Sequence, residues 1–226
     1  MPKPSPTTDT PLGVAFDLDG TLVDPREGIV ACLEYALERL EIDSPDPAEL
    51  AKHIGPPLSV TFAKLLATDD PELIKKAVSI YRERFAVSGI FENSTYAGIP
   101  EVLDALRSAG MSLFVATSKP SNYTRKILTQ CGIAASFRQI YGSEMDGTRA
   151  AKGELIKHLL KNEKLKPEEL VVVGDRKHDI IGAHALGVRA VGVLWGYGSF
   201  EELDEAGADL YCRTPGDLPG LLTGQG

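Results

Sequence analysis

The chain has 226 residues, of which 43% are hydrophobic and 25% are charged, and its formal net charge is −8. This composition is typical of a soluble globular protein with one large domain, or with a core domain and a smaller insertion. The negative charge argues against a binder of nucleic-acid polymers or of membrane surfaces, since both require a basic face. No apolar stretch approaches the roughly 18 residues that a membrane-spanning helix needs.

The amino-terminal residues are rich in proline and hydroxyl side chains and lack the apolar core of a signal peptide. We expect a flexible tail over residues 1–11. The three cysteines, Cys32, Cys131 and Cys212, fit neither a disulfide framework nor a zinc site, which favours a reducing compartment. We therefore expect a cytoplasmic protein, and the sequence is compatible with a monomer or a homodimer.

The first predicted strand, over residues 12–17, ends in two acidic residues, Asp17 and Asp19. A short apolar run bounded by turn residues is typical of a buried strand, and side chains at positions i and i+2 begin on the same face. Two crowded carboxylates repel each other, so a site that keeps both ionised needs a cation. Oxygen ligands suit a hard ion, and we expect Mg²⁺ as the cofactor. The alternative is a surface turn, since Asp-Gly-Thr is common turn chemistry.

The segment from Pro25 to Glu92 shows no strand signal of any length. Its first helix is expected to use Asp24 as N-cap, with Pro25 at the first helical position and Glu27 in a capping box. Further helices are predicted over 47–53, 58–67 and 71–87. An all-helical stretch of this size inside an α/β chain indicates an inserted subdomain.

From Tyr96 onward, short strands and helices alternate along the chain. This alternation, with its short connections, predicts a parallel sheet with right-handed crossovers. The expected fold is therefore α/β, with a doubly wound, Rossmann-like parallel sheet over 12–24 and 94–226 and an all-helical cap over 25–93. The predicted elements are helices over 99–108, 121–130, 152–161, 179–186 and 200–206, and strands over 113–116, 138–141, 170–173, 188–193 and 209–211.

Two later strands also end in polar residues. In open α/β sheets, ligands bind at the carboxyl ends of the strands. These ends meet at one edge of a parallel sheet, so we expect Asp17, Thr117 and Asp175 to converge there, whereas a scattered arrangement would exclude a shared site. The polar residues are Thr117, Ser118 and Lys119 after one strand, Asp175 and Asp179 after the other, and Lys152 at the start of the helix between them.

This order of carboxylate pair, hydroxyl, lysine and second carboxylate pair resembles the four motifs of the haloacid dehalogenase-like hydrolase superfamily. The resemblance covers the chain from about Leu12 to about Pro219. It implies an Mg²⁺-dependent phosphomonoesterase that acts on a small phosphorylated metabolite. The stretches at 116–120, 142–149, 174–183 and 193–198 are similar to the phosphoglycolate phosphatase branch, and within it to members described as 5′-nucleotidase-like.

The resemblance implies a catalytic role for residues of the first three motifs. Asp17 would be the nucleophile that forms an aspartyl phosphate, and it would also bind the metal ion. Asp19 would protonate the leaving oxygen and then deprotonate water, and its backbone carbonyl would bind the metal ion as well. Thr117, the backbone amide of Ser118 and Lys152 would hold the phosphate.

The resemblance also assigns residues around the metal ion and the substrate. Asp175 would bind Mg²⁺. Asp179 would bind the metal ion through a water molecule or support the residues that bind it. The alternative for Asp179 is a helix N-cap. Thr21 would orient the first loop. Gly55 lies in a loop of the expected cap that would face the substrate, and the alternative for this loop is a plain turn between two helices. Lys119 would help to hold phosphate or substrate.

Other charged residues near these motifs have less definite expectations. Arg176, Lys177 and His178 are expected to be exposed, because the mechanism needs no histidine. Arg82 and Arg84 could supply a cationic contact from the helix over 71–87, although such residues are usually solvated.

Several functions stay open at this point. The presence of Asp19 argues against a dehalogenase, because the members that cleave carbon–halogen bonds lack the second acid. A phosphosugar mutase of the same fold and a non-catalytic protein that binds a phosphorylated ligand are the alternatives to a phosphatase. The substrate could be a nucleotide, phosphoglycolate or a sugar phosphate.

Overall fold

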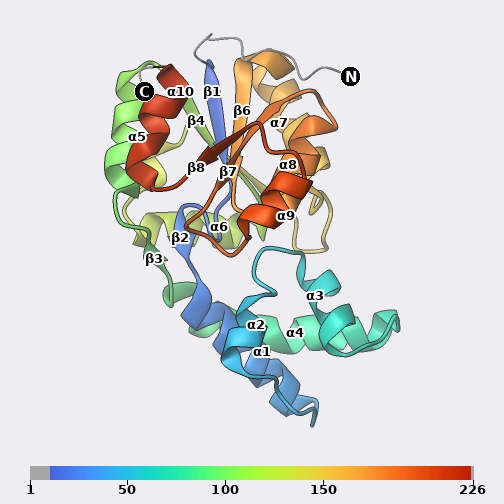
Figure 1. The fold of residues 1–226 in the computed structure, drawn as a ribbon. Coiled ribbons are helices and arrows are strands. Elements are labelled where there is room, and N and C mark those ends of the chain that lie inside the picture. Colours follow the sequence, from blue (N-terminus) through green and yellow to red (C-terminus); the bar gives the residue numbers. More distant parts are fainter. Residues whose placement is uncertain (1–10, 225–226) are drawn as a thin grey trace.

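A parallel sheet forms the centre of the fold (Figure 1). The computed structural model describes residues 11–224, so the tail predicted over 1–11 lies outside the described residues except for Pro11. Within that range, six strands lie in the order β5-β4-β1-β6-β7-β8, and every neighbouring pair is parallel. This arrangement confirms the predicted doubly wound α/β fold. The strands are β1 (Gly13–Phe16), β4 (Ser112–Pro120), β5 (Gln139–Ser143), β6 (Leu170–Gly174), β7 (Arg189–Val193) and β8 (Leu210–Cys212).

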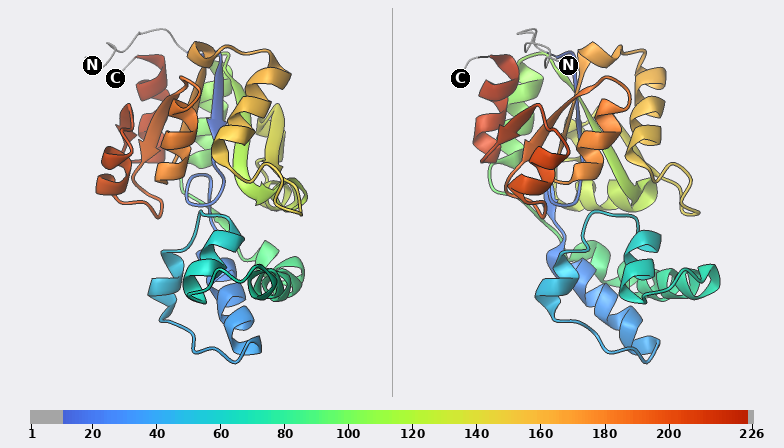
Figure 2. Two further views of the ribbon diagram at one scale, coloured as in Figure 1. Left: turned by 90° about the vertical axis from the view of Figure 1, so that its right-hand side faces the viewer. Right: turned by 45° about the vertical axis from the view of Figure 1, so that its right-hand side comes forward.

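Helices cover both faces of the sheet because the central strands are apolar on both sides. β1 and β6 are buried over their whole length, and alternate residues of β1 join two separate cores, with Phe16 in one and Ala15 in the other. Helices α5, α6 and α10 pack on the first face, and α7, α8 and α9 on the second (Figures 1 and 2). Their bounds are α5 (Ile99–Ser108), α6 (Ser121–Gln130), α7 (Lys152–Glu163), α8 (Lys177–His184), α9 (Phe200–Glu205) and α10 (Leu218–Thr223).

The helices within residues 25–93 form a separate layer at the carboxyl edge of the sheet, which we call the cap layer (Figures 1 and 2). The chain enters and leaves this layer through β2 (Val23–Asp24) and β3 (Ser94–Thr95), which pair antiparallel. Aromatic rings of Phe62, Tyr81 and Phe85 pack against one another inside it. The helices are α1 (Arg26–Arg39), α2 (Pro47–Ala51), α3 (Leu58–Leu65) and α4 (Pro71–Val87).

The start of α1 differs from its prediction. The helix begins at Arg26 with Pro25 as N-cap and no side-chain cap, so the predicted Asp24 N-cap and its capping box are wrong. The physical reason is that Asp24 belongs to β2, where it pairs with Ser94. From there its carboxylate accepts a hydrogen bond from the Arg26 amide at 2.9 Å.

Other element bounds agree with the predictions to different degrees. Helices α4, α5 and α6 have the predicted bounds. Helix α8 begins at Lys177, which places Asp179 inside the helix and excludes its alternative role as N-cap. The pair β2–β3 and helix α10 were not predicted. Short 3₁₀ helices lie at Gly89–Phe91, Ala134–Ser136, Pro167–Glu169 and Pro215–Asp217.

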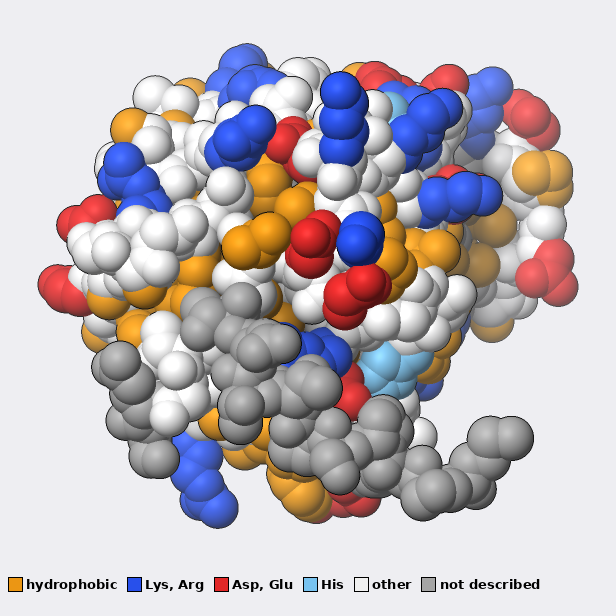
Figure 3. All heavy atoms as spheres, turned by 90° about the horizontal axis from the view of Figure 1, so that it is seen from above, with side chains coloured by type: hydrophobic (Ala, Val, Ile, Leu, Met, Phe, Trp, Pro, Cys, Tyr) orange, Lys and Arg blue, Asp and Glu red, His pale blue; other side chains and the backbone are white. Residues whose placement is uncertain are grey.

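The face opposite the cap layer carries charges of both signs (Figure 3). Lysine and arginine side chains are interspersed there with aspartate and glutamate side chains, and hydrophobic side chains lie between them. Among residues 11–224, no helix is both long enough and apolar enough to cross a membrane.

Candidate active site

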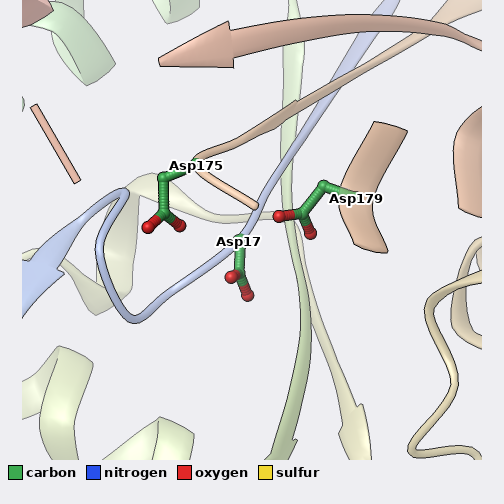
Figure 4. Close-up of side chains that lie close together, drawn as sticks. All are labelled: Asp17, Asp175 and Asp179. Carbon is green, nitrogen blue, oxygen red and sulfur yellow. The ribbon is translucent and has the colours of Figure 1, made fainter. Parts of the chain in front are cut away.

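Three buried carboxylates meet at the carboxyl edge of the sheet (Figure 4). Asp17 directly follows β1, Asp175 directly follows β6, and Asp179 lies in the first turn of α8. One oxygen from each lies within 4.8 Å of the others, and the three residues are 5%, 0% and 0% exposed. β1 and β6 are hydrogen-bonded parallel neighbours, so their carboxyl ends lie together. The sheet therefore brings the predicted strand ends to one point.

Lys152 is the cation of this cluster. It is the first residue of α7, and its Nζ lies 2.6 Å from Asp17 Oδ1 and 2.7 Å from Asp179 Oδ1. The same ammonium donates to the Ala116 carbonyl at 2.7 Å. Burial alone would lower the pKa of Lys152, but the attraction of Asp17 and Asp179 outweighs it and the pKa lies above its usual value. Lys152 is therefore charged and fixed beside Asp17.

The cluster has more negative than positive charge. Burial, together with Asp17 and Asp179, raises the pKa of Asp175 to about 8. Burial also raises the pKa of Asp179 to about 6, although Lys152 opposes this shift. One lysine cannot neutralise three ionised carboxylates, so a divalent cation with a preference for oxygen ligands fits the donor set. Mg²⁺ has these properties.

Close packing holds the Asp175 carboxylate in place. Thr21 donates to one of its oxygens at 3.2 Å, and the Tyr197 amide donates to the other at 2.8 Å. Gly20 has a φ of +83°, and a Cβ there would lie 2.2 Å from Asp175 Oδ2. A Cβ at Gly174 would lie 2.2 Å from Asp179 Cγ. Any larger residue at these positions would displace the carboxylates, which explains the glycines of the two motifs.

The phosphate-binding candidates lie on the neighbouring strand. Thr117, Ser118 and Lys119 occupy the end of β4, where its register with β5 shifts, and all three line the same cavity as Asp17 and Asp19. Thr117 Oγ1 accepts the Lys119 amide at 3.2 Å. The Ser118 hydroxyl donates to the Ala150 carbonyl at 2.7 Å, so its side chain already has a partner. The backbone amide of Ser118 is thus the part of this residue suited to phosphate.

Asp19 has a different environment from the three clustered carboxylates. Its side chain is 11% exposed and accepts a hydrogen bond from Lys119 Nζ at 2.8 Å. Burial raises the pKa of Asp19, and Lys119 opposes this shift. The ammonium of Lys119 also lies 5.0 Å from the centroid of the Phe85 ring in the cap layer. A carboxyl with a raised pKa can carry a proton, as an acid catalyst must.

The cap layer supplies the opposite wall of the cavity, which has a volume of about 650 Å³. Gly55 lies in this wall, in the loop between α2 and α3, together with neighbouring residues from His53 to Ser59. Helix α4 contributes Ile74, Val78 and Tyr81. The wall is mostly apolar. Arg82 also lines it and donates to the Met145 carbonyl of the core at 2.8 Å, whereas Arg84 pairs with Glu92 at 2.8 Å.

Arg176 corrects one sequence-based expectation. Lys177 and His178 are exposed, as expected, but the Arg176 side chain is only 12% exposed. Its guanidinium pairs with Glu202 at 2.9 Å and donates to the Ile54 carbonyl of the cap layer. These partners lie 26 and 122 positions away along the chain, so no local pattern could reveal the contacts.

Comparisons with known proteins agree with this architecture. The family model described as haloacid dehalogenase-like hydrolase matches residues 14–193. A 5′-nucleotidase of Pseudomonas aeruginosa is 48% identical over 199 residues, which cover 88% of this chain and 90% of that protein. The tyrosine-protein kinase PtkA of Mycobacterium tuberculosis is 41% identical over 198 residues, which cover 87% of this chain and 67% of that protein.

Two further matches extend over nearly the whole chain. A predicted phosphatase from Clostridium acetobutylicum superposes with a TM-score of 0.91 and 36% identity, over 95% of this chain and 99% of that structure. A phosphoglycolate phosphatase of Vibrio parahaemolyticus is 26% identical over 212 residues, which cover 91% of this chain and 93% of that protein. These matches include the sheet and the cap layer together.

Proposed function

The chain belongs to the haloacid dehalogenase-like hydrolases and is a phosphomonoesterase of that family, and on this premise we propose that it hydrolyses nucleoside 5′-monophosphates with Mg²⁺. One observation carries the proposal. The buried carboxylates of Asp17, Asp175 and Asp179 lie together. Lys152 pairs with Asp17 and Asp179, and Asp19 lines the same cavity as Asp17. A protein that only bound a phosphorylated ligand would not need Asp19 as a proton donor.

The proposed reaction has two steps. An Asp17 oxygen attacks phosphorus, the bond from phosphorus to the leaving oxygen breaks, and an aspartyl phosphate forms while Asp19 donates its proton to that oxygen. Asp19 then takes a proton from water, the water oxygen attacks phosphorus, and the bond to Asp17 breaks with release of inorganic phosphate. The raised pKa of the buried Asp19 carboxyl supports this exchange of a proton.

The remaining polar groups would hold the phosphate and the metal ion. The Thr117 hydroxyl, the Ser118 amide and the Lys152 ammonium would bind phosphate oxygens. Asp17, Asp175 and the Asp19 carbonyl would hold Mg²⁺, with Asp179 in contact directly or through water. When bound, the cation neutralises charge on the phosphoryl oxygens.

The cavity favours a nucleotide over a smaller phosphate ester. Its volume of about 650 Å³ is in the range of sites for drug-sized ligands. Leu58, Val78 and Tyr81 make much of its cap-side wall apolar. The two-carbon carboxylate of phosphoglycolate would leave this wall unfilled, whereas a nucleoside has a flat, weakly polar base to place against it. The 5′-nucleotidase among the relatives supports the same choice.

The proposed activity is tested by the release of inorganic phosphate from a panel of phosphomonoesters. The panel contains nucleoside 5′-monophosphates, phosphoglycolate, sugar phosphates and an aryl phosphate, each with Mg²⁺ and with EDTA. We expect metal-dependent release with the highest kcat/KM for a nucleotide. A preference for phosphoglycolate would contradict the substrate assignment.

Two other outcomes would replace the proposal with a different activity. Isomerisation of a sugar phosphate that depends on a bisphosphate, with little free phosphate, would indicate a mutase. Transfer of the γ-phosphate of ATP to tyrosine would indicate the activity named for the mycobacterial relative.

We also propose a cytoplasmic location. Cys32, Cys131 and Cys212 are free thiols in the structure, and burial raises the pKa of each. Such thiols are unreactive and suit a reducing compartment. Detection of the protein in an extracytoplasmic fraction of its native cell would contradict this location.

A further inference from the structure

Arg176 connects the carboxylate cluster to the cap layer. It follows Asp175 directly in the chain, and its backbone amide donates to Asp179 Oδ2 at 3.2 Å. Its guanidinium donates to the Ile54 carbonyl and lies 3.5 Å from the Lys52 carbonyl. One residue therefore touches both the carboxylate cluster and the cap loop, which we define as residues 52–58.

Glu202 of the core holds the Arg176 guanidinium in a fixed position. Its Nε and Nη2 lie 2.9 and 3.3 Å from the two carboxylate oxygens of Glu202, a bidentate pair. Glu202 also accepts the Lys177 amide at 3.0 Å. Although burial opposes the ionised form of Glu202, the hydrogen bonds from Arg176 and the Lys177 amide lower its pKa. The core therefore holds the remaining nitrogen, Nη1, in position for the cap-loop carbonyl.

The cap loop is shaped to receive this side chain. Gly55 has a φ of +112°, which residues with a Cβ rarely adopt. A Cβ at this position would also lie 3.0 Å from Arg176 Cγ. The same loop contributes Ile54, Gly55 and Leu58 to the wall of the cavity. A displacement of the Ile54 carbonyl would thus move the wall that faces the leaving group.

We propose that Arg176 is a positioning residue that holds the cap loop over the reaction centre, and that Glu202 preorganises it for this task. Its guanidinium contacts cap-loop carbonyls and Glu202, and the phosphate-binding candidates Thr117 and Lys152 have other partners. Arg176 therefore positions the cap loop against the leaving group, while residues of the core bind the phosphoryl group. This inference rests on the proposed function for the identity of the leaving group, but not for the contact itself.

The contact is tested first without any substrate. Hydrogen–deuterium exchange of peptides that cover residues 52–60 is measured for the wild type, R176Q and E202Q, in Mg²⁺ and inorganic phosphate. We expect faster exchange in both variants, with the larger increase in R176Q, and unchanged exchange in peptides of β1 and β6. The matched control is K177A, because Lys177 is the neighbouring cation and its side chain is exposed. Unchanged exchange over 52–60 in R176Q would overturn the proposal.

Steady-state kinetics then separate positioning from general damage to the site. In R176Q we expect kcat/KM for a nucleoside 5′-monophosphate to fall about 10- to 100-fold, the range for loss of a charge-assisted hydrogen bond. The inhibition constant of inorganic phosphate should change less than about twofold, since phosphate contacts only the core in this scheme. E202Q should show a smaller fall, and K177A should show none. An equal loss in phosphate affinity would overturn the proposal, because Arg176 would then act through Asp175 and Asp179.

The two measurements test the proposed function and the role of Arg176 separately. If the wild type hydrolyses no nucleotide, the proposed function is wrong, whereas the exchange experiment still decides whether Arg176 holds the cap loop. If R176Q does not fold, E202Q decides the same question, because it leaves Arg176 in place and removes the charge and one of the two acceptor oxygens that fix it. Wild-type exchange over 52–60 in a folded E202Q would overturn the part assigned to Glu202.

Discussion

The two walls of the cavity are built in different ways. On the core side, Asp17 and Thr117 line the cavity at the carboxyl ends of β1 and β4, and Lys152, at the start of α7, pairs with Asp17. All three residues are 7% exposed or less. On the cap side, a loop and one face of α4 supply mostly apolar and partly exposed side chains. This wall reaches the core through contacts such as those of Arg176 and Arg82.

Under the proposed function, the core wall would carry out the reaction and the cap wall would select the substrate. Buried charges need fixed partners, because a displaced partner leaves an uncompensated charge in a low-dielectric site. An apolar wall tolerates changes in shape and size at much lower cost. We therefore expect changes on the core side to abolish turnover or destabilise the fold, and changes on the cap side to alter the choice of substrate.

The largest effect is expected from D17N. This change removes the proposed nucleophile while it keeps the size of the side chain, so kcat should fall by a factor on the order of 10⁴ or more. The thermal transition should stay close to that of the wild type, because the change replaces one of three crowded carboxylates with a neutral amide of the same size. Near-normal turnover by the folded variant would show that Asp17 is not the nucleophile.

A large loss of stability is expected from K152M. Without the ammonium, Asp17 and Asp179 lose the cation that lies 2.6 and 2.7 Å from them. Breaking a buried ion pair from one side costs roughly 3–5 kcal/mol, so the variant should unfold at a clearly lower denaturant concentration in EDTA. K157M on the exposed side of α7 is the matched control. Equal unfolding midpoints for the two variants would contradict the role given to Lys152.

A selective effect is expected from V78W on the cap side. Val78 lines the cavity, and the larger side chain reduces the space for the leaving group. We expect kcat/KM to fall about tenfold for a nucleotide, the order of discrimination that pocket size gives, and less than about twofold for the smallest substrate turned over. V87W is the control, since Val87 is on the same helix and is 74% exposed. A uniform loss over all substrates would show that this wall does not select.

The last predicted effect is a pH dependence of the folding stability of the metal-free protein. The pKa of Asp175 is about 8 in the fold against an ordinary value of 3.8, and that of Asp179 is about 6. The folded protein therefore keeps protons that the unfolded chain has released over this range, so stability falls as the pH rises from about 4 to about 8. In EDTA we expect the Tm to fall on the order of 10 °C between pH 5 and pH 8.

Mg²⁺ should act against this pH dependence. A cation that binds only the folded protein raises its Tm. Because this cation is bound by ionised carboxylates, Mg²⁺ should raise the Tm more at pH 8 than at pH 5. Thermal unfolding followed by circular dichroism, with EDTA and with excess Mg²⁺ at each pH, gives both comparisons. A Tm in EDTA that rises with pH would contradict the raised pKa values of the cluster.

Parts of the fold with strong local signals were predicted from the sequence. The apolar runs before Asp17, Thr117 and Asp175 mark three strands, and those strands are neighbours in the sheet. Helices α4, α5 and α6 have the predicted bounds because periodicity and Pro or Gly residues mark their ends. The pair β2–β3 was missed, since each strand has two residues and a period cannot be recognised over that length.

Contacts between residues that lie far apart along the chain could not be predicted from the sequence. Asp179 was assigned either to the metal ion through water or to an N-cap, and only the packing of α8 against α7 and β6 brings it within 2.7 Å of Lys152. Arg176 was expected to be exposed, yet its partners Glu202 and Ile54 come from two other parts of the fold. Neither contact leaves a pattern in the residues around it.

The sequence by itself determined which chemistry the site can perform, because a carboxylate pair, a hydroxyl, a lysine and a second carboxylate pair each stand at the end of a strand or the start of a helix. Such positions are local properties of the chain, and parallel pairing of the strands is enough to bring them to one edge. The tertiary structure alone decided how the cavity is closed and how its charges are balanced. Both depend on residues that lie far apart along the chain, such as Arg176 and Ile54 at 122 positions, and only packing sets the distances between them.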